Sequence, residues 1–192
     1  MIKLSRFTRL TVIGAISALL LGTFAACSQG SSPHAKKVLM ACLAVTNIDA
    51  SQILGGKLTA FKLSGENSPI HVCEYNDARD NTHGLIQITK SASKDPAANL
   101  AADAAQVKVL FKNNITPLQV HAAKGFGNGA FYVDNTQSPT ASSVQLHFIE
   151  NGYKIMVQVN DPKDFATGEK QTAVMAQKAL ADIQNGSAFQ AL

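Results

Sequence analysis

The clearest alternation of apolar and polar residues lies in two runs in the second half of the chain, at residues 144–150 and 153–160. Asn151-Gly152 separates these runs, and this dipeptide tolerates the positive φ angles of a tight hairpin turn. Within each run, apolar side chains occupy every second position, which places them on one face of a strand. The pattern predicts a β-hairpin with one dry face and one wetter face.

Shorter apolar runs between turn signals predict five more strands. They lie at residues 58–63, 70–75, 85–89, 115–122 and 129–134. Helical spacing of apolar residues predicts helices at 39–54 (in two pieces), 95–112 and 164–185. The resulting order, α-βββ-α-ββββ-α, is typical of an α+β domain. We therefore expect an antiparallel sheet of about six to seven strands covered by helices.

Local signals set the ends of these helices. Thr46 or Asn47 is expected to cap the second piece of the first helix, which Gly55-Gly56 then stops. Asp95-Pro96 opens the next helix, because proline suits a first helical turn. Gly186 ends the last helix.

Residues 1–26 have the composition of a bacterial signal peptide. Lys3, Arg6 and Arg9 precede a run of 17 uncharged residues, which is short of the roughly 20 that span a membrane. The run ends in Thr23-Phe24-Ala25-Ala26-Cys27, which resembles the lipobox at which bacterial lipoprotein precursors are cleaved and acylated, although Phe24 replaces the usual aliphatic residue. Ordinary secretion after Ala25 and an uncleaved anchor are the alternatives.

The three cysteines are consistent with this interpretation. An exported protein rarely keeps a free thiol, and acylation of Cys27 leaves Cys42 and Cys73 as one pair. A disulfide between them closes a loop of about 30 residues. The alternative is two buried free cysteines.

These signals divide the chain into four parts. Residues 1–26 form the signal peptide, 27–38 a flexible polar tether, 39–186 a single globular domain and 187–192 a tail. We expect an extracytoplasmic lipoprotein held in the membrane by acyl chains, palmitate among them, on Cys27. In a bacterium with two membranes, Ser28 after the cysteine favours the outer one.

Charge excludes one class of partner. The net charge of +4 falls to +1 once Lys3, Arg6 and Arg9 are removed, because 14 basic and 13 acidic residues remain. The longest basic cluster in the rest of the chain is the pair Lys36-Lys37. A nucleic-acid partner is therefore not expected.

Candidate chemistry is sparse. The loop from Gly125 through Gly127 to Gly129 lacks the Lys-Ser/Thr of a phosphate-binding loop and precedes a strand, so we interpret it as a structural turn. His121, His147 and Met156 would suit a soft metal if they shared the outer face of the sheet, but the histidines lie on separate elements, and we expect no metal. Motifs of nucleophilic or zinc-dependent hydrolases are absent, so neither a catalytic residue nor a cofactor is expected.

The cysteine pair, Cys73-Glu74-Tyr75 and the glycine loop followed by Ala130-Phe131 together resemble a family of uncharacterised bacterial envelope lipoproteins of actinobacterial type. The resemblance covers nearly the whole mature chain. It implies one domain with a PsbP-like α-β-α sandwich, and it carries no activity with it.

Two functions compete at this point. The first, which we favour, is a non-catalytic interaction module that binds an envelope protein or a cell-wall component. The second is a carrier of a small apolar ligand in a cavity between sheet and helices. The first predicts a filled core with an exposed apolar patch, and the second predicts a cavity of several hundred Å³.

Replacing Cys27 with serine tests the lipid anchor. Cys27→Ser removes the only sulfur next to the predicted cleavage site, so fatty-acid labelling should be lost and the protein should leave the membrane fraction. Cys73→Ser is the control and should keep the label. Unchanged membrane fractionation of Cys27→Ser, together with an intact precursor mass, would contradict the lipoprotein interpretation.

Overall fold

The computed structural model describes residues 37–64, 68–110, 118–138 and 141–191. The predicted signal peptide, Cys27 and nearly all of the predicted tether lie outside these residues. In the part of the chain that is described, no helix is long and apolar enough to cross a membrane.

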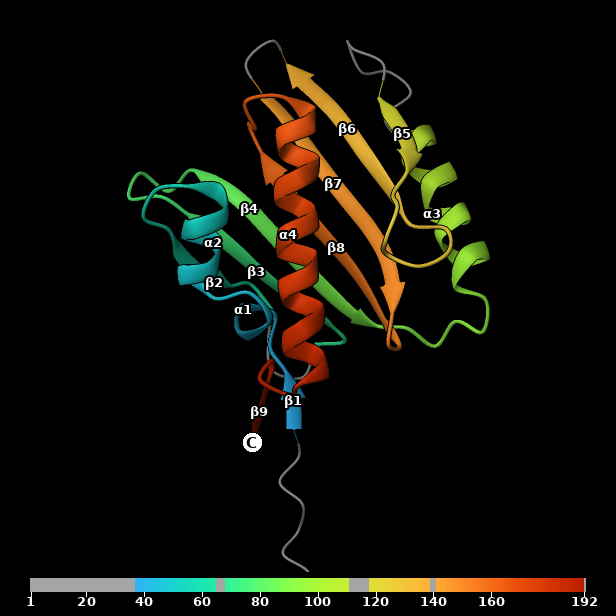
Figure 1. The fold of residues 1–192 in the computed structure, drawn as a ribbon, viewed down its shortest axis with the longest axis horizontal. Coiled ribbons are helices and arrows are strands. Elements are labelled where there is room, and N and C mark those ends of the chain that lie inside the picture. Colours follow the sequence, from blue (N-terminus) through green and yellow to red (C-terminus); the bar gives the residue numbers. More distant parts are fainter. Residues whose placement is uncertain (1–36, 65–67, 111–117, 139–140, 192) are drawn as a thin grey trace, which may run out of the picture. The chain divides into compact units, whose positions relative to one another are not determined.

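Seven antiparallel strands form the main sheet, as predicted (Figure 1). From edge to edge they are β2 (Thr59–Lys62), β3 (Ile70–Asn76), β4 (Thr82–Lys90), β8 (Tyr153–Asn160), β7 (Ala141–Glu150), β6 (Phe131–Ser138) and β5 (Gln119–Ala122). The chain builds two meanders, β2 to β4 and β5 to β8, and β4 joins them by pairing with β8.

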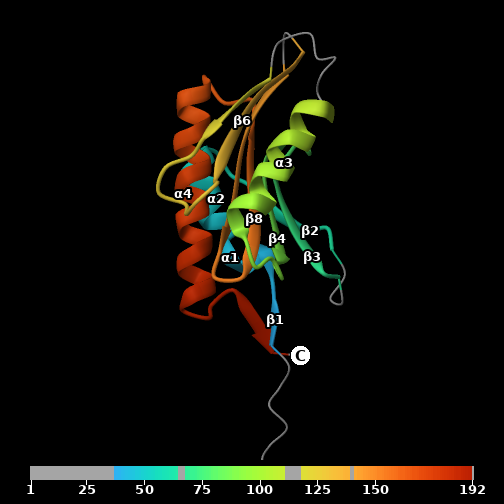
Figure 2. The same ribbon diagram turned by 90° about the vertical axis from the view of Figure 1, so that its right-hand side faces the viewer.

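Helices lie on both faces of the sheet. On one face are α1 (Ala41–Ala44), α2 (Asn47–Leu54) and α4 (Phe165–Gln184), and on the other is α3 (Pro96–Leu110) (Figure 2). The predicted α+β class, with helices covering an antiparallel sheet, is confirmed.

Side-chain caps begin the helices close to the predicted residues. The Thr46 hydroxyl accepts a hydrogen bond from the Asp49 backbone N–H at 3.2 Å, and the Asp49 carboxylate accepts one from Thr46 N–H at 3.0 Å. Asp95 accepts from Ala98 N–H at 3.0 Å at the start of α3. These bonds satisfy donors that have no partner within a helix.

The main core lies between the sheet and α4. Six apolar side chains on the dry face of the predicted hairpin are buried there: Val144, Leu146, Phe148, Ile155, Val157 and Val159. Gly168 lets α4 approach the sheet closely, because a Cβ at this position would lie 2.6 Å from Val144 Cγ2. The dry face predicted for the hairpin is therefore the face under α4.

A smaller core lies under α3 on the opposite face. Leu100 packs there against Phe131, Val133 and Ile149, which belong to β6 and β7. This second core occupies only the β5–β7 half of the sheet, so α3 covers half of its face.

A two-stranded ribbon that the sequence did not predict joins the two ends of the domain. β1 (Lys37–Leu39) pairs with β9 (Phe189–Ala191), and Met40 N–H donates to the Ala188 carbonyl at 2.8 Å. From the sequence, the tether was expected to end at residue 38 and the tail to begin at residue 187. The ribbon therefore includes residues that were assigned to the tether and to the tail. Strands of three residues are too short for their alternation to be recognised.

Cys42 and Cys73 form the predicted disulfide, with their Cα atoms 5.1 Å apart. Two residues further along β3, the buried Tyr75 hydroxyl donates to the Val45 carbonyl at 2.6 Å, and burial raises the pKa of Tyr75. The segment around α1 is thus attached to β3 by a covalent bond and by a buried hydrogen bond.

Loss of the disulfide should destabilise the domain without unfolding it. Cys42→Ser should lower the free energy of unfolding by about 2–4 kcal/mol, because the unfolded chain regains the freedom of a long loop. Tyr75→Phe, which removes only the neighbouring hydrogen bond, should cost about 1 kcal/mol. Urea unfolding followed by circular dichroism measures both. Two freely alkylatable thiols in the folded, unreduced protein would contradict the pairing.

Candidate functional site

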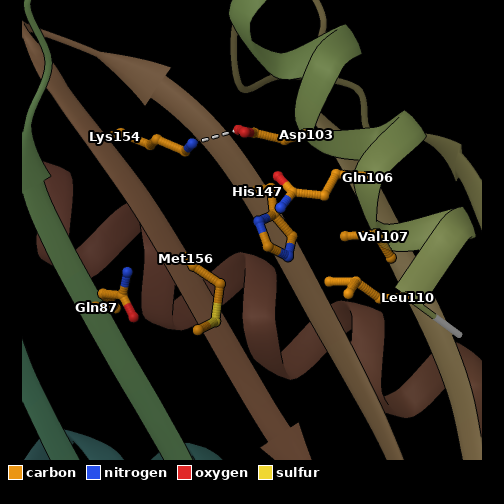
Figure 3. Close-up of a pocket in the computed structure, with 8 residues that line it drawn as sticks. All are labelled: Gln87, Asp103, Gln106, Val107, Leu110, His147, Lys154 and Met156. Carbon is orange, nitrogen blue, oxygen red and sulfur yellow. Dashed lines mark ion pairs between the residues drawn. The ribbon is translucent and has the colours of Figure 1, made fainter.

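The edge of α3 borders a groove of about 310 Å³ on the sheet face that α3 covers only in part. Figure 3 shows side chains of α3 projecting toward the strands that carry the rest of the lining. The lining residues are Asp103, Gln106, Val107 and Leu110 of α3, Gln87 of β4, His147 of β7, and Lys154 and Met156 of β8.

Strand register builds the floor of this groove. Val72, Gln87, Met156, His147 and Phe131 are successive cross-strand neighbours on β3, β4, β8, β7 and β6. Residues directly opposite each other in an antiparallel sheet point to the same face. The five side chains therefore form one row across the sheet, running from its uncovered half to the core under α3.

His147 is held as a neutral ring in the middle of this row. Its ring stacks on Phe131, with centroids 4.7 Å apart and planes inclined by 3°. Its Nε2 lies 3.0 Å from the side-chain oxygen Oε1 of Gln145, which accepts hydrogen bonds only, so Nε2 carries the proton. Burial lowers the pKa of His147 to about 4, against the opposing effect of the Asp103 charge.

A chain of side-chain amides continues from His147 across β7 and β8. Gln145 Nε2 donates to Gln158 Oε1 at 3.0 Å, and Gln158 Nε2 donates to Asn160 Oδ1 at 2.6 Å. Asn160 Nδ2 then donates to the Thr82 carbonyl at 2.9 Å. All the bonds run in the same direction, so each polarises the next and fixes the conformations of these side chains.

An ion pair attaches α3 to the sheet beside the groove. Lys154 Nζ of β8 lies 2.5 Å from the Asp103 carboxylate, and both side chains are partly exposed (Figure 3). Such a pair contributes little stability, about 0–1 kcal/mol. Both of its side chains line the groove.

Apolar side chains are exposed on the uncovered part of the same face. Phe61 is 42% exposed, Leu63 56% and Ile70 41%. Phe61 is the cross-strand neighbour of Glu74, and Ile70 and Glu74 occupy alternate positions on β3 that share the face of Val72. We call Phe61, Leu63 and Ile70 the exposed apolar patch, and the part of the sheet face that α3 leaves uncovered the open face.

None of the glycines singled out in the sequence lines the groove. Gly125, Gly127 and Gly129 lie between β5 and β6 with φ angles of 87°, 81° and 83°, a region that favours glycine. Phe126 in this loop is buried against Phe148, with ring centroids 5.2 Å apart. The loop therefore closes one end of the main core and leads into a strand.

The condition under which His121, His147 and Met156 would suit a soft metal, a shared outer face of the sheet, is not met by His121. His147 and Met156 are cross-strand neighbours that face the groove. His121 instead pairs with Tyr132, which packs in the main core on the α4 side. The register of β5 against β6 decides this, and it was not readable from the sequence.

The hydrogen-bonded amides on the α3 face of the sheet were not singled out as candidate site residues from the sequence. The sequence did place Gln145, Gln158 and Asn160 on the wetter face, which was the only signal available. Their mutual hydrogen bonds depend on the pairing of β7 with β8 and on side-chain conformation.

The fold and the groove define an α+β domain with helices on both faces of an antiparallel sheet and one face half open. Comparison with models of known protein families and with curated proteins found no match for this chain. The resemblance to envelope lipoproteins consequently rests on the quoted motifs alone and stays a prediction.

The buried, neutral state of His147 predicts a specific pH dependence of stability. The unfolded chain binds a proton at His147 near pH 6.5, whereas the folded protein does so only near pH 4. As the pH falls through this window the unfolded state gains protons first, so stability falls. Because His147 is partly accessible to solvent, we expect the free energy of unfolding to fall by only about 1–2 kcal/mol across this window.

His147→Gln keeps a hydrogen-bonding group at this position and removes the titration. The difference in free energy of unfolding between wild type and His147→Gln should therefore shrink by about 1–2 kcal/mol between pH 7 and pH 4. Chemical unfolding at pH 7, 5 and 4 measures it. A difference that does not change with pH would show that His147 is not held neutral by the fold.

Proposed function

We propose that this protein is a non-catalytic interaction module of a bacterial cell envelope, anchored by lipid on Cys27, that binds a protein partner on its open face. One observation carries the proposal: α4 and its neighbours cover one face of the sheet, whereas α3 covers only half of the other. The uncovered half presents the exposed apolar patch and the groove side by side.

The chemistry of this face suits an extended peptide segment. Phe61, Leu63 and Ile70 offer apolar contacts, and large apolar side chains gathered on a surface mark interaction sites. Gln87 and Gln106 in the groove carry both a donor and an acceptor, which matches the alternating N–H and C=O groups of a peptide backbone. The row of side chains that starts at Val72 and Gln87 runs straight across the strands, so an extended segment can lie along it.

The groove is poorly suited to the alternative function, transport of a small apolar ligand. Its lining includes the Lys154–Asp103 ion pair and two glutamines. The space between sheet and α4 is filled by fully buried side chains such as Phe148, Ile155 and Met175. A carrier needs an apolar cavity where this domain has a packed core.

The groove lining also favours binding over catalysis. Among the described residues, the lining contains no serine, threonine or cysteine that His147 would activate as a nucleophile. His147 itself donates through Nε2 to Gln145, an amide with no basic character. The stacking of His147 on Phe131 and its hydrogen bond to Gln145 keep the ring in place, and neither contact provides a route for proton transfer.

The tether expected at residues 27–38 would enter the domain at β1. β1 and β9 lie together at the end of the domain where α4 ends (Figure 1). The exposed apolar patch lies on other elements, β2 and β3 and the residue after β2. A lipid anchor on Cys27 is therefore compatible with a partner bound at the open face.

Site-specific photo-crosslinking in the native bacterium tests the proposal. A photoreactive phenylalanine at position 63 should give one discrete protein adduct, since Leu63 lies in the exposed apolar patch. The same group at position 48 is the matched control, because Ile48 is 65% exposed but lies on α2, on the other face. Ile70→Asn should abolish the adduct formed from position 63.

Binding to the purified partner then provides the decisive measurement. Ile70→Asn should weaken binding at least about tenfold, whereas Ile48→Asn should leave it unchanged, as expected when a few buried apolar residues dominate an interface. Equal binding by both variants would refute the open face as the interface. A stoichiometric small molecule retained in native mass spectra of membrane-extracted protein would instead support the carrier function.

A further inference from the structure

A second cluster of functional side chains lies at the β5 edge of the sheet, on the face under α4. It consists of His121 of β5, Asp134 of β6 and Glu169 near the start of α4. His121 Nε2 is 3.0 Å from Asp134 Oδ2 and 3.4 Å from Glu169 Oε1. One potential ligand atom from each residue lies within 4.8 Å of the other two.

The fold brings these residues together through one strand register and one close helix contact. His121 pairs with Tyr132, so His121, Tyr132 and Asp134 share the α4 face. Asp134 in turn pairs with Val144, the residue that α4 approaches closely through Gly168. Glu169 follows Gly168 directly, so the same contact places its carboxylate beside Asp134.

The cluster carries more negative charge than its neighbours neutralise. Asp134 is only 4% exposed, and its Oδ1 accepts no hydrogen bond from the part of the chain that the structure describes. Among those residues, the ion pairs of Asp134 and Glu169 are both made with the single side chain of His121. A buried carboxylate oxygen without a partner is costly, and a bound cation removes that cost.

The ring of Tyr132 lies beside His121, with centroids 5.5 Å apart. On the solvent side, His121 and Glu169 have side chains that are 40% and 32% exposed, which gives an ion a path to the buried carboxylate.

We propose that His121, Asp134 and Glu169 bind a divalent transition-metal ion, Zn²⁺ foremost, through one nitrogen and two carboxylate groups. Ligands about 2.0–2.1 Å from a tetrahedral ion lie about 3.3 Å from one another, close to the observed 3.0 and 3.4 Å. The set has no sulfur to select copper(I), and it has too few oxygens for calcium.

This site departs from the sequence-based expectation of no metal, and it is independent of the proposed function. Its ligands come from three elements, and their positions along the chain match no metal-binding motif. Three protein ligands and an exposed side leave a coordination position for water or for a group from another molecule. The groove lies on the opposite face of the sheet.

Metal binding to the full-length protein tests the site. The protein is purified in detergent without a histidine tag, freed of metal with a chelator, and titrated calorimetrically with ZnCl₂. We expect one Zn²⁺ per chain, and Glu169→Gln and His121→Ala should each weaken binding at least about tenfold. His83→Ala is the matched control, because His83 also lies near a carboxylate, Asp77 at 3.2 Å, and it should leave the affinity unchanged.

Cobalt(II) gives a second readout that does not depend on affinity alone. Co²⁺ in a tetrahedral nitrogen and oxygen site should produce visible absorption that Glu169→Gln weakens and His83→Ala preserves. Glu169 is partly exposed, so its variant should fold even if His121→Ala does not. Absence of stoichiometric Zn²⁺ binding, or binding that Glu169→Gln leaves unchanged, would overturn the proposal.

Discussion

The pairing of β4 with β8 is the constraint on which the rest of the domain depends. It runs from Gly84 opposite Val159 to Lys90 opposite Tyr153 and joins two meanders that otherwise share no strand contact in the main sheet. Because β4 is the third strand from one edge and β5 is the opposite edge, the intervening α3 crosses the face of the β5–β7 half. The uncovered half of that face and the groove at its border follow from this crossing.

The two faces of the sheet therefore differ in chemistry. The α4 face is dry and packed, and one cluster of titratable groups lies near the start of α4, at His121, Asp134 and Glu169. The α3 face carries a neutral histidine, His147, and a hydrogen-bonded chain of amides. Both candidate sites lie where a helix stops covering the sheet, because there polar groups reach solvent while the neighbouring core holds them rigid.

The N-terminal end of the described domain is attached to the rest of the fold at several points. β1 pairs with β9, and soon after β1 the chain is bonded to β3 through Cys42–Cys73 and through the hydrogen bond of Tyr75. Chain ends fray unless they are attached in this way.

The sequence by itself determined the hairpin strand Tyr153–Asn160, the cap at Thr46, the cysteine pair and the α+β class. Periodicity and capping act over short distances along the chain, and the cysteine pair follows from the number of cysteines. Only the tertiary structure decided the strand order, the β1–β9 ribbon and the cluster formed by Asp134 and Glu169. These depend on which surfaces bury each other across tens of residues, and no local pattern encodes that choice. The face of His121 shows the limit, since a shift of one residue in strand register reverses the face to which every side chain points.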